Sequence, residues 1–175
     1  MRYFLCLGSN IGDRAKNLER ALVLLEEAGM IIIRRSSLYE TQPVDMADQP
    51  WFYNRVVEAE GNLSPHELLR MIKKIERRMG RRSAPAKGPR LIDIDILLAG
   101  RTVLKTEELV IPHPRLERRN FVLVPLKEIS PDIVHPLLRK KVKDLFRKSG
   151  DQSVVRKVDG AKTEAGKGEK QTEQQ

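Results

Sequence analysis

Two aspartates in an otherwise apolar segment are the residues best placed to do chemistry. Asp93 and Asp95 lie in LIDIDILL, residues 91–98. A run this rich in isoleucine predicts a strand, in which alternate side chains share a face, so the two carboxylates should lie about 7 Å apart on one side. Hard oxygen ligands of this kind suit Mg²⁺ better than a transition metal. The alternative is a half-exposed strand whose polar face simply meets water.

The loop in front of this strand is strongly basic. Residues 80–90 read GRRSAPAKGPR, which places several cations, among them Arg81 and Arg90, directly before the acidic pair. Guanidinium groups bind phosphoryl oxygens in bidentate geometry, so this loop and the carboxylates together could enclose a metal-bound polyphosphate. The alternative is a solvated loop of ordinary surface charge. The adjacency of the loop and the acidic pair favours the phosphate interpretation.

Four strands must position these residues. Alternating or β-branched apolar residues predict strands over 3–7, 30–39, 52–61 and 91–98. Between the second and third strands, residues 40–51 contain two prolines and little periodicity, which predicts a loop.

The expected helices fall between the strands. One should follow the N-cap Asp13 and end before Gly29, and another should follow a capping box at Ser64 and end at Gly80. A last helix is predicted around residues 138–146. The order βαββαβ predicts an α+β fold, a ferredoxin-like layered sandwich with a largely antiparallel sheet flanked by helices.

The length of 175 residues is sufficient for one compact core and too short for two ordinary domains. We therefore expect a single domain over residues 1–149. Composition shifts at Gly150, and residues 150–175 are rich in Lys, Glu, Gln and Gly, which predicts a charged, disordered tail.

The net charge of +9 is carried by the predicted domain, because residues 151–175 hold five basic and five acidic side chains. A basic body fits a pocket for polyphosphates and also fits a nucleic-acid-binding module. Only 5% of the residues are aromatic, and two aspartates on the clearest strand would repel a phosphate backbone. We therefore expect no nucleic-acid partner.

No stretch approaches the roughly 20 apolar residues of a membrane helix, and the first ten residues lack the features of a cleaved signal. The single Cys6 can form no internal disulfide and is expected to be a buried structural thiol. These features predict a cytoplasmic protein without a membrane partner. We expect a monomer, although nothing in the sequence marks the oligomeric state.

Three motifs together resemble a known family. They are GPRLIDIDIL at residues 88–97, LGSNIG at residues 7–12 and IPHP at residues 111–114. Their types and order are similar to those of the 6-hydroxymethyl-7,8-dihydropterin pyrophosphokinase (HPPK) family, and the resemblance spans about residues 1–146. It does not include the tail.

The resemblance implies a step of folate biosynthesis, in which ATP and 6-hydroxymethyl-7,8-dihydropterin are the substrates and AMP is released. By position, Asp93 and Asp95 match the metal ligands of the family, for which two Mg²⁺ ions are expected, and Arg81 and Arg90 match its catalytic arginines. The nucleotide-binding positions that match are Glu76, Arg81, Arg90, Ile96, His113 and Arg119. Glu76 is expected on the polar side of its helix, and no residue is marked as a general base.

The pterin-binding positions that match are Thr41, Pro43, Val44, Phe52, Asn54 and Phe121. Aromatic rings suit a flat heterocycle, and the Asn54 amide can recognise its donor and acceptor edge. The alternative is that Phe52 and Phe121 are ordinary core residues.

Four positions depart from the more familiar pattern: Lys87 replaces a tryptophan, Glu108 a basic residue, Pro114 an aromatic one and Gln42 a proline. These changes leave open a degenerate member of the family that binds ligands without turnover. The intact acidic pair and matched arginines favour an active enzyme.

Overall fold

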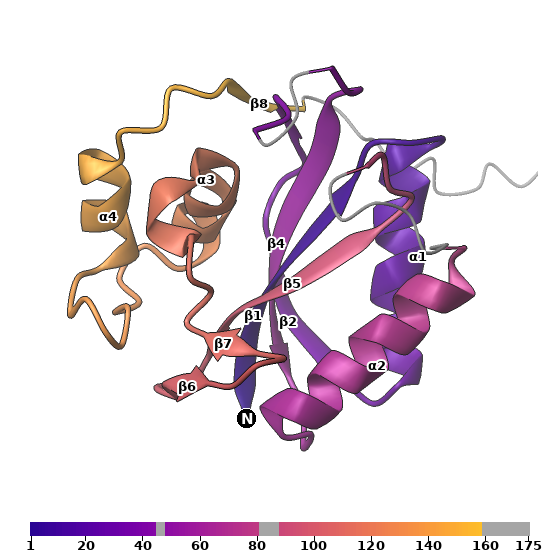
Figure 1. The fold of residues 1–175 in the computed structure, drawn as a ribbon, viewed down its shortest axis with the longest axis horizontal. Coiled ribbons are helices and arrows are strands. Elements are labelled where there is room, and N and C mark those ends of the chain that lie inside the picture. Colours follow the sequence, from indigo (N-terminus) through magenta and orange to yellow (C-terminus); the bar gives the residue numbers. More distant parts are fainter. Residues whose placement is uncertain (45–47, 81–87, 159–175) are drawn as a thin grey trace, which may run out of the picture.

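A six-stranded, antiparallel sheet forms the centre of the protein. The computed structural model describes residues 1–44, 48–80 and 88–158. The strand order is β5-β1-β4-β3-β8, and β2 also pairs with β4 (Figure 1). The bounds are β1 Arg2–Ser9, β2 Ile31–Arg35, β3 Tyr39–Thr41, β4 Phe52–Glu60, β5 Asp93–Ala99 and β8 Val155–Lys157.

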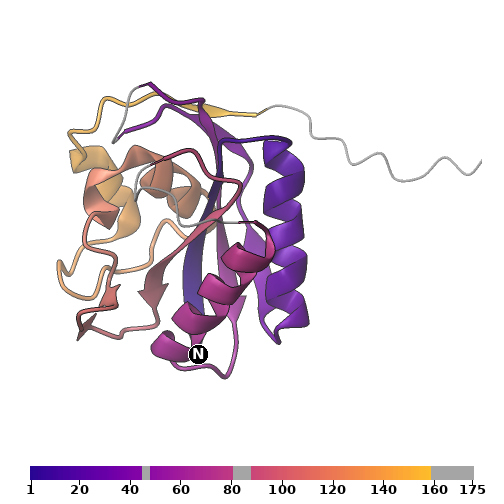
Figure 2. The ribbon, with the colours of Figure 1, turned by 45° about the vertical axis from the view of Figure 1, so that its right-hand side comes forward.

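Two long helices, α1 (Arg14–Glu27) and α2 (Pro65–Arg78), cover one face of the sheet (Figures 1 and 2). The Asp13 side chain caps α1 by accepting the Lys16 N–H, and Ser64 forms the predicted capping box of α2 with Glu67. Apolar residues of both helices join those of the sheet in one buried cluster, which includes Leu5, Leu7, Leu22, Leu25, Leu68, Ile72, Ile94 and Ile96.

The opposite face is covered by α3 (Asn120–Ile129) and α4 (Val142–Lys148). A short 3₁₀ helix, η1 (Leu116–Arg118), precedes α3, and a small hairpin of β6 (Leu104–Lys105) and β7 (Val110–Ile111) follows β5. A second apolar cluster fills this face and includes Phe4, Val56, Leu97, Leu98, Leu123, Leu126 and Leu145.

Strand alternation divides β1 and β5 between the two faces. Ile94 and Ile96 join the cluster under α1 and α2, whereas Leu97 and Leu98 both join the cluster under α3. A register shift between Phe4 and Leu5 on β1 accounts for two consecutive β5 residues on one side. Asp93 and Asp95 therefore share one face of β5, as their spacing predicted, and the structure shows that this is the α3 side.

The observed architecture confirms the α+β sandwich and corrects several details. The strand predicted over residues 30–39 is two strands, β2 and β3, and Thr41 of the predicted loop belongs to β3. α3 was not predicted at all. Disorder from Gly150 is wrong up to residue 158, because Val155–Lys157 forms β8 against β3. The rest of the predicted tail lies outside the described residues.

Within residues 1–44, 48–80 and 88–158, no helix is long and apolar enough to cross a membrane. The monomeric state and the cytoplasmic location stay predictions.

Candidate active site

A cleft of about 710 Å³, including its open mouth, lies on the α3 side of the sheet. Its floor comes from β1, β4 and β5, and its walls come from the segment after β3 and from the start of α3. Predicted site residues lining it are Thr41, Pro43, Val44, Phe52, Asn54, Arg90, Asp93, Asp95, Arg119 and Phe121. The structure thus brings the predicted metal, arginine and pterin positions into one cavity.

The acidic pair lies on the floor of this cleft and not on a freely solvated face. In the sheet register Asp93 lies opposite Gly8, and Asp95 lies opposite Cys6. Burial and the negative charge of Asp93 raise the pKa of Asp95 to about 7, although the nearby Arg119 acts in the opposite direction. The two acids are therefore close enough for one to oppose ionisation of the other.

This pair fits a cation that draws its other ligands from a substrate. Among the residues that the structure describes, no group of three or more His, Cys, Asp or Glu side chains could hold a metal ion alone. Mg²⁺ is commonly bound through one or two carboxylates together with phosphate oxygens and water. Asp93 and Asp95 could provide two such carboxylates, and a positive ion beside them would remove the repulsion between them.

Two arginines border the acidic pair. Arg90 forms an ion pair with Asp93 at 2.8 Å, and its side chain is 19% exposed. Arg119 is buried, lines the cleft and lies with its guanidinium carbon 5.4 Å from the centre of the Phe121 ring. Arg81 lies outside the described residues. The described part of the site therefore has two cations beside two carboxylates, and guanidinium groups of this kind suit phosphoryl oxygens.

Asn10 holds Arg90 in place, and sequence reasoning assigned it no role. The Asn10 side-chain oxygen accepts the Arg90 N–H at 2.7 Å, and the Asn10 N–H donates to the Arg90 carbonyl at 3.1 Å. The Asn10 amide also donates to Gln49 and to the Pro50 carbonyl, each at 3.2 Å. One buried side chain thus ties the end of β1 to both segments that approach the cleft. Its place in the motif after the first strand was the available signal.

The pterin-matched residues form a compact polar and aromatic wall. Asn54 is buried and donates its amide to the Thr41 hydroxyl at 2.5 Å. Gly8 lies directly against it, because a Cβ at that position would approach the Asn54 amide oxygen to 2.6 Å. Phe52 and Phe121 are half-buried and line the cleft, although Phe121 also packs against the second apolar cluster. The interpretation of both rings as purely core residues is therefore wrong.

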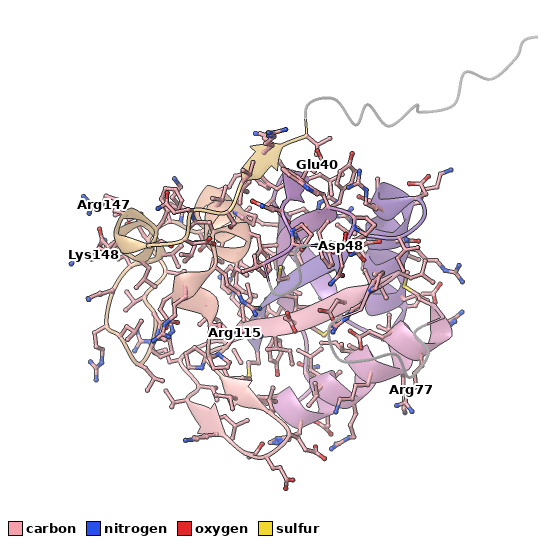
Figure 3. The ribbon with its side chains drawn as sticks, turned by 45° about the horizontal axis from the view of Figure 1, so that its top comes forward. Glu40, Asp48, Arg77, Arg115, Arg147 and Lys148 are labelled. Carbon is pink, nitrogen blue, oxygen red and sulfur yellow. The ribbon has the colours of Figure 1, made fainter. Side chains whose placement is uncertain are left out.

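His113 lies next to β5 but is not among the residues lining the cleft. Its N–H donates to the Leu97 carbonyl at 2.9 Å, and its ring Nδ1 accepts the Arg115 N–H at 3.2 Å. Burial, with the charges of Arg119 and Arg115, lowers the pKa of His113 to about 4, so the ring is neutral at pH 7. Because Nδ1 accepts, the ring proton is on Nε2, which is then a donor suited to a phosphate oxygen. Figure 3 shows Arg115 near β5.

Two other nucleotide-matched residues are placed differently from expectation. Glu76 is only 4% exposed, so its assignment to the polar side of α2 is wrong. Its carboxylate accepts the Ile94 N–H at 2.9 Å, which fixes the open edge of β5 between the two aspartates. Ile96 points its side chain into the cluster under α1 and α2. Neither side chain lines the cleft within the described residues.

Together, the sheet, its two helical layers and the cleft define an α+β sandwich with one site suited to phosphate groups and a flat ring. The chain belongs to the 7,8-dihydro-6-hydroxymethylpterin-pyrophosphokinase (HPPK) family, whose model matches residues 4–131. This confirms the resemblance drawn from the three motifs.

Named relatives and solved structures agree with this assignment. A Bacillus subtilis 2-amino-4-hydroxy-6-hydroxymethyldihydropteridine pyrophosphokinase is 45% identical over 131 residues, covering 74% of this chain and 78% of the relative. The enzyme of that name from Aquifex aeolicus is 44% identical, over 81% of this chain and 88% of its own. A Plasmodium falciparum HPPK-DHPS structure with pteroate matches with a TM-score of 0.68 at 20% identity, covering 84% of this chain and 42% of that one, which shows the shared fold.

Several relatives are much longer than this chain. An Arabidopsis thaliana mitochondrial folate synthesis bifunctional protein is 47% identical over 71% of this chain but only 23% of its own length. For a Pneumocystis carinii folic acid synthesis protein the identity is 40%, over 86% of this chain and 20% of the relative. The chain therefore spans about a fifth to a quarter of these proteins.

Proposed function

We propose that this chain transfers a pyrophosphoryl group from ATP to the hydroxymethyl group of 6-hydroxymethyl-7,8-dihydropterin, in folate biosynthesis. A bond forms between the hydroxymethyl oxygen and the β-phosphorus of ATP. The bond from that phosphorus to the oxygen it shares with the α-phosphorus breaks, and AMP leaves with that oxygen. The hydroxyl proton is lost in the same reaction, and no described residue is assigned as its base.

One observation carries the proposal: the acidic pair and two arginines share a single cleft with the aromatic and amide residues matched to pterin binding. A phosphate-binding site alone would not need Phe52, Phe121 and Asn54 beside it. Conversely, a site for a neutral heterocycle alone would not need two partly buried carboxylates with opposing cations. The combination suits an enzyme that brings a ring and a polyphosphate together.

Asp93 and Asp95 are the residues that would hold Mg²⁺, and two ions are proposed. The metal supplies charge neutralisation at the phosphate oxygens when it is bound. Arg90 pairs with Asp93 at 2.8 Å, so a guanidinium suited to phosphoryl oxygens lies directly beside the proposed metal ligands.

The remaining side chains orient the substrates. Phe52 and Phe121 offer faces for the ring, and the Asn54 amide, fixed by Thr41 and by the close approach of Gly8, can recognise its polar edge. Arg119 places a buried positive charge near the acidic pair, where it can stabilise charge on the transferred group. Holding both substrates in line supplies much of the rate enhancement of phosphoryl-type transfer.

The two alternatives from the sequence are less well supported. An RNA-binding sheet needs an accessible face for stacking bases, whereas helices cover both faces of this sheet (Figure 2). A degenerate member of the family would be expected to have lost part of the acidic pair or its arginines. In this chain Asp93, Asp95 and Arg90 are all present and line the same cleft. Catalysis remains the better proposal.

The test is an assay of the purified chain with ATP, Mg²⁺ and 6-hydroxymethyl-7,8-dihydropterin, with AMP and the pterin diphosphate measured by chromatography. Pterin-dependent formation of both products in equal amounts is expected. AMP that forms equally without pterin would indicate ATP hydrolysis, and tight pterin binding without product would identify the degenerate alternative.

A further inference from the structure

The chain after α4 crosses the top of the molecule to reach β8 (Figure 1). Residues 149–158, here called the C-terminal strap, contact the start of α3 at one end and β3 with the following segment at the other. The strap lies beyond residues 4–131, the part matched by the family model.

At the first wall, Asp151 caps α3 although it lies 31 residues beyond Asn120 in the chain. The Asn120 N–H donates to a carboxylate oxygen of Asp151 at 2.6 Å, and the Asn120 side chain donates to the Asp151 carbonyl at 2.8 Å. The local cap residue, Arg119, makes no side-chain hydrogen bond to the helix. Asp151 therefore supplies both the acceptor and the negative charge that a helix N-terminus favours.

The Asp151 carboxylate is itself held firmly. The second carboxylate oxygen accepts the Ser153 N–H at 2.8 Å, and the backbone N–H of Asp151 donates to the Ser149 hydroxyl at 3.3 Å. Burial alone would raise the pKa of Asp151, but the hydrogen bonds from Asn120 and Ser153, with the charge of Arg119, outweigh it and hold the pKa below its usual range. The group is thus an ionised, oriented acceptor at neutral pH.

At the second wall, the strap is fastened to the segment matched to pterin binding. The Gln42 N–H donates to the Val154 carbonyl at 3.1 Å, and the Val154 N–H donates to the Gln42 side chain at 3.4 Å. β8 then pairs with β3, with Val155 opposite Thr41. Figure 3 shows Glu40 of β3 beside β8.

We propose that Asp151 is a positioning residue of the pterin site. Asn120, which it holds, stands between Arg119 and Phe121, and both neighbours line the cleft. Asp151 thereby fixes the first turn of α3 relative to Thr41 and Gln42 on the opposite wall. The inference rests on the proposed pterin-binding function of this cleft.

The packing of α3 separates this role from general stability. Leu123 and Leu126 are fully buried in the second apolar cluster, and this packing does not depend on the cap. Loss of Asp151 should therefore loosen the first turn of α3 without detaching the helix. The consequence is a displaced Phe121 ring and a weaker site.

The test compares three variants of the full chain by calorimetric titration with 6-hydroxymethyl-7,8-dihydropterin in the presence of a non-hydrolysable ATP analogue. Loss of a helix cap destabilises a helix start by about fivefold, and pterin binding would have to restore the first turn of α3 against this cost, so Asp151→Ala should weaken pterin binding by about the same factor. Asp151→Asn keeps a capping oxygen and should recover most of the affinity. Asp132→Ala is the control: this acid follows the other end of α3, pairs with Lys141 and Lys143, and does not line the cleft.

Amide hydrogen exchange of the ligand-free variants gives a second readout. In Asp151→Ala, exchange at Asn120 and Phe121 should accelerate, whereas exchange at Leu126 should stay close to wild type. Unchanged pterin affinity in Asp151→Ala, or an equal loss in Asp132→Ala, would overturn the proposal. If wild type itself binds no pterin, the proposed function fails and this role fails with it, while the exchange data still show whether Asp151 fixes α3.

Discussion

The two faces of the sheet are built differently. Under α1 and α2 lies a continuous apolar cluster in which Tyr3, Leu5 and Leu7 of β1 alternate toward the helices. Under α3 and α4 the same strand contributes Phe4 and Cys6, and the apolar cluster occupies only part of the face. The polar cleft takes the rest of it.

Because of this difference, neighbouring side chains on one strand have different roles: some pack in the apolar core and others line the cleft. On β5, Ile94 packs under the long helices, while its neighbours Asp93 and Asp95 face the cleft. Substitutions one residue apart should therefore have opposite consequences, because each face depends on a different kind of interaction.

The largest expected effect is on the cleft side. Asp95→Asn removes a proposed metal ligand and should lower turnover by about a thousandfold, the magnitude typical of losing a strong electrostatic contact in a transition state. Steady-state assays with both substrates saturating would measure it. Turnover within tenfold of wild type would mean that Asp95 is no ligand.

The same variant should be more stable than wild type without ligands. The pKa of Asp95 is about 7 in the fold against an ordinary 3.8, so the folded protein holds a proton that the unfolded chain releases between these values. The stability that wild type gains from this proton on Asp95 is fully present below pH 4 and is lost as the pH rises through 7. Denaturant unfolding should show Asp95→Asn stabilised at pH 8 and nearly unchanged at pH 4.

On the other face, Ile94→Ala should lower the free energy of unfolding by about 3 kcal/mol, because it removes buried methyl groups and leaves a cavity. Urea unfolding would measure this loss. At a temperature where the variant stays folded, its KM for pterin should remain within twofold of wild type. A tenfold rise in KM would show that the two faces are not separable.

An intermediate effect is expected at the aromatic wall. Phe121→Ala removes a ring face and should weaken pterin binding about tenfold, in line with the usual contribution of an aromatic contact in a binding site. Calorimetric titration would measure it. Phe146→Ala is the matched control. That ring packs at the edge of the second cluster and makes a cation–π contact with Lys127 outside the cleft.

Metal binding should depend on pH because of the same acidic pair. A carboxylate with a pKa of about 7 is mostly protonated at pH 6 and mostly ionised at pH 8, and only the ionised form binds a cation. Titration of the ligand-free protein with Mn²⁺ should give about tenfold tighter apparent binding at pH 8 than at pH 6. In Asp95→Asn this difference should disappear.

The smallest expected effect is at the capping box of α2. Ser64→Ala should cost about 1 kcal/mol of stability by removing the acceptor for the Glu67 N–H. Thermal unfolding would show a modest fall in melting temperature. Activity below that temperature should not change, because α2 begins at the end of the molecule away from the cleft.

The sequence predicted the stable face better than the reactive one for a physical reason. The N-caps of α1 and α2 are adjacent in sequence to their helices, so Asp13 and Ser64 predicted where both helices begin. The start of α3 has no local cap, its acceptor comes from Asp151, and Pro125 interrupts its interior. The capping acceptor is distant in the sequence, and a proline inside the segment argues against a helix. For these reasons the sequence did not predict α3.

In the site, too, features set by local sequence could be predicted, whereas features set by distant contacts could not. The spacing of Asp93 and Asp95 predicted their common face, and the family resemblance predicted the pterin-matched residues, Arg90 and Arg119, which line the same cleft. The burial of Glu76 could not be predicted, because it depends on the open edge of β5, where the Ile94 N–H needs an acceptor. Asn10 was overlooked because its partners, Arg90 and Gln49, are far away in the chain.

The proposed function depends above all on metal binding by the acidic pair on the α3 face. Paramagnetic broadening of backbone amide signals by Mn²⁺, with a non-hydrolysable ATP analogue present, tests it most directly. Broadening should be greatest around Gly8, Asp93 and Asp95 and clearly weaker in α1, which packs on the opposite face of the sheet. Broadening centred on any other part of the molecule, or unchanged in a variant lacking both acids, would contradict it.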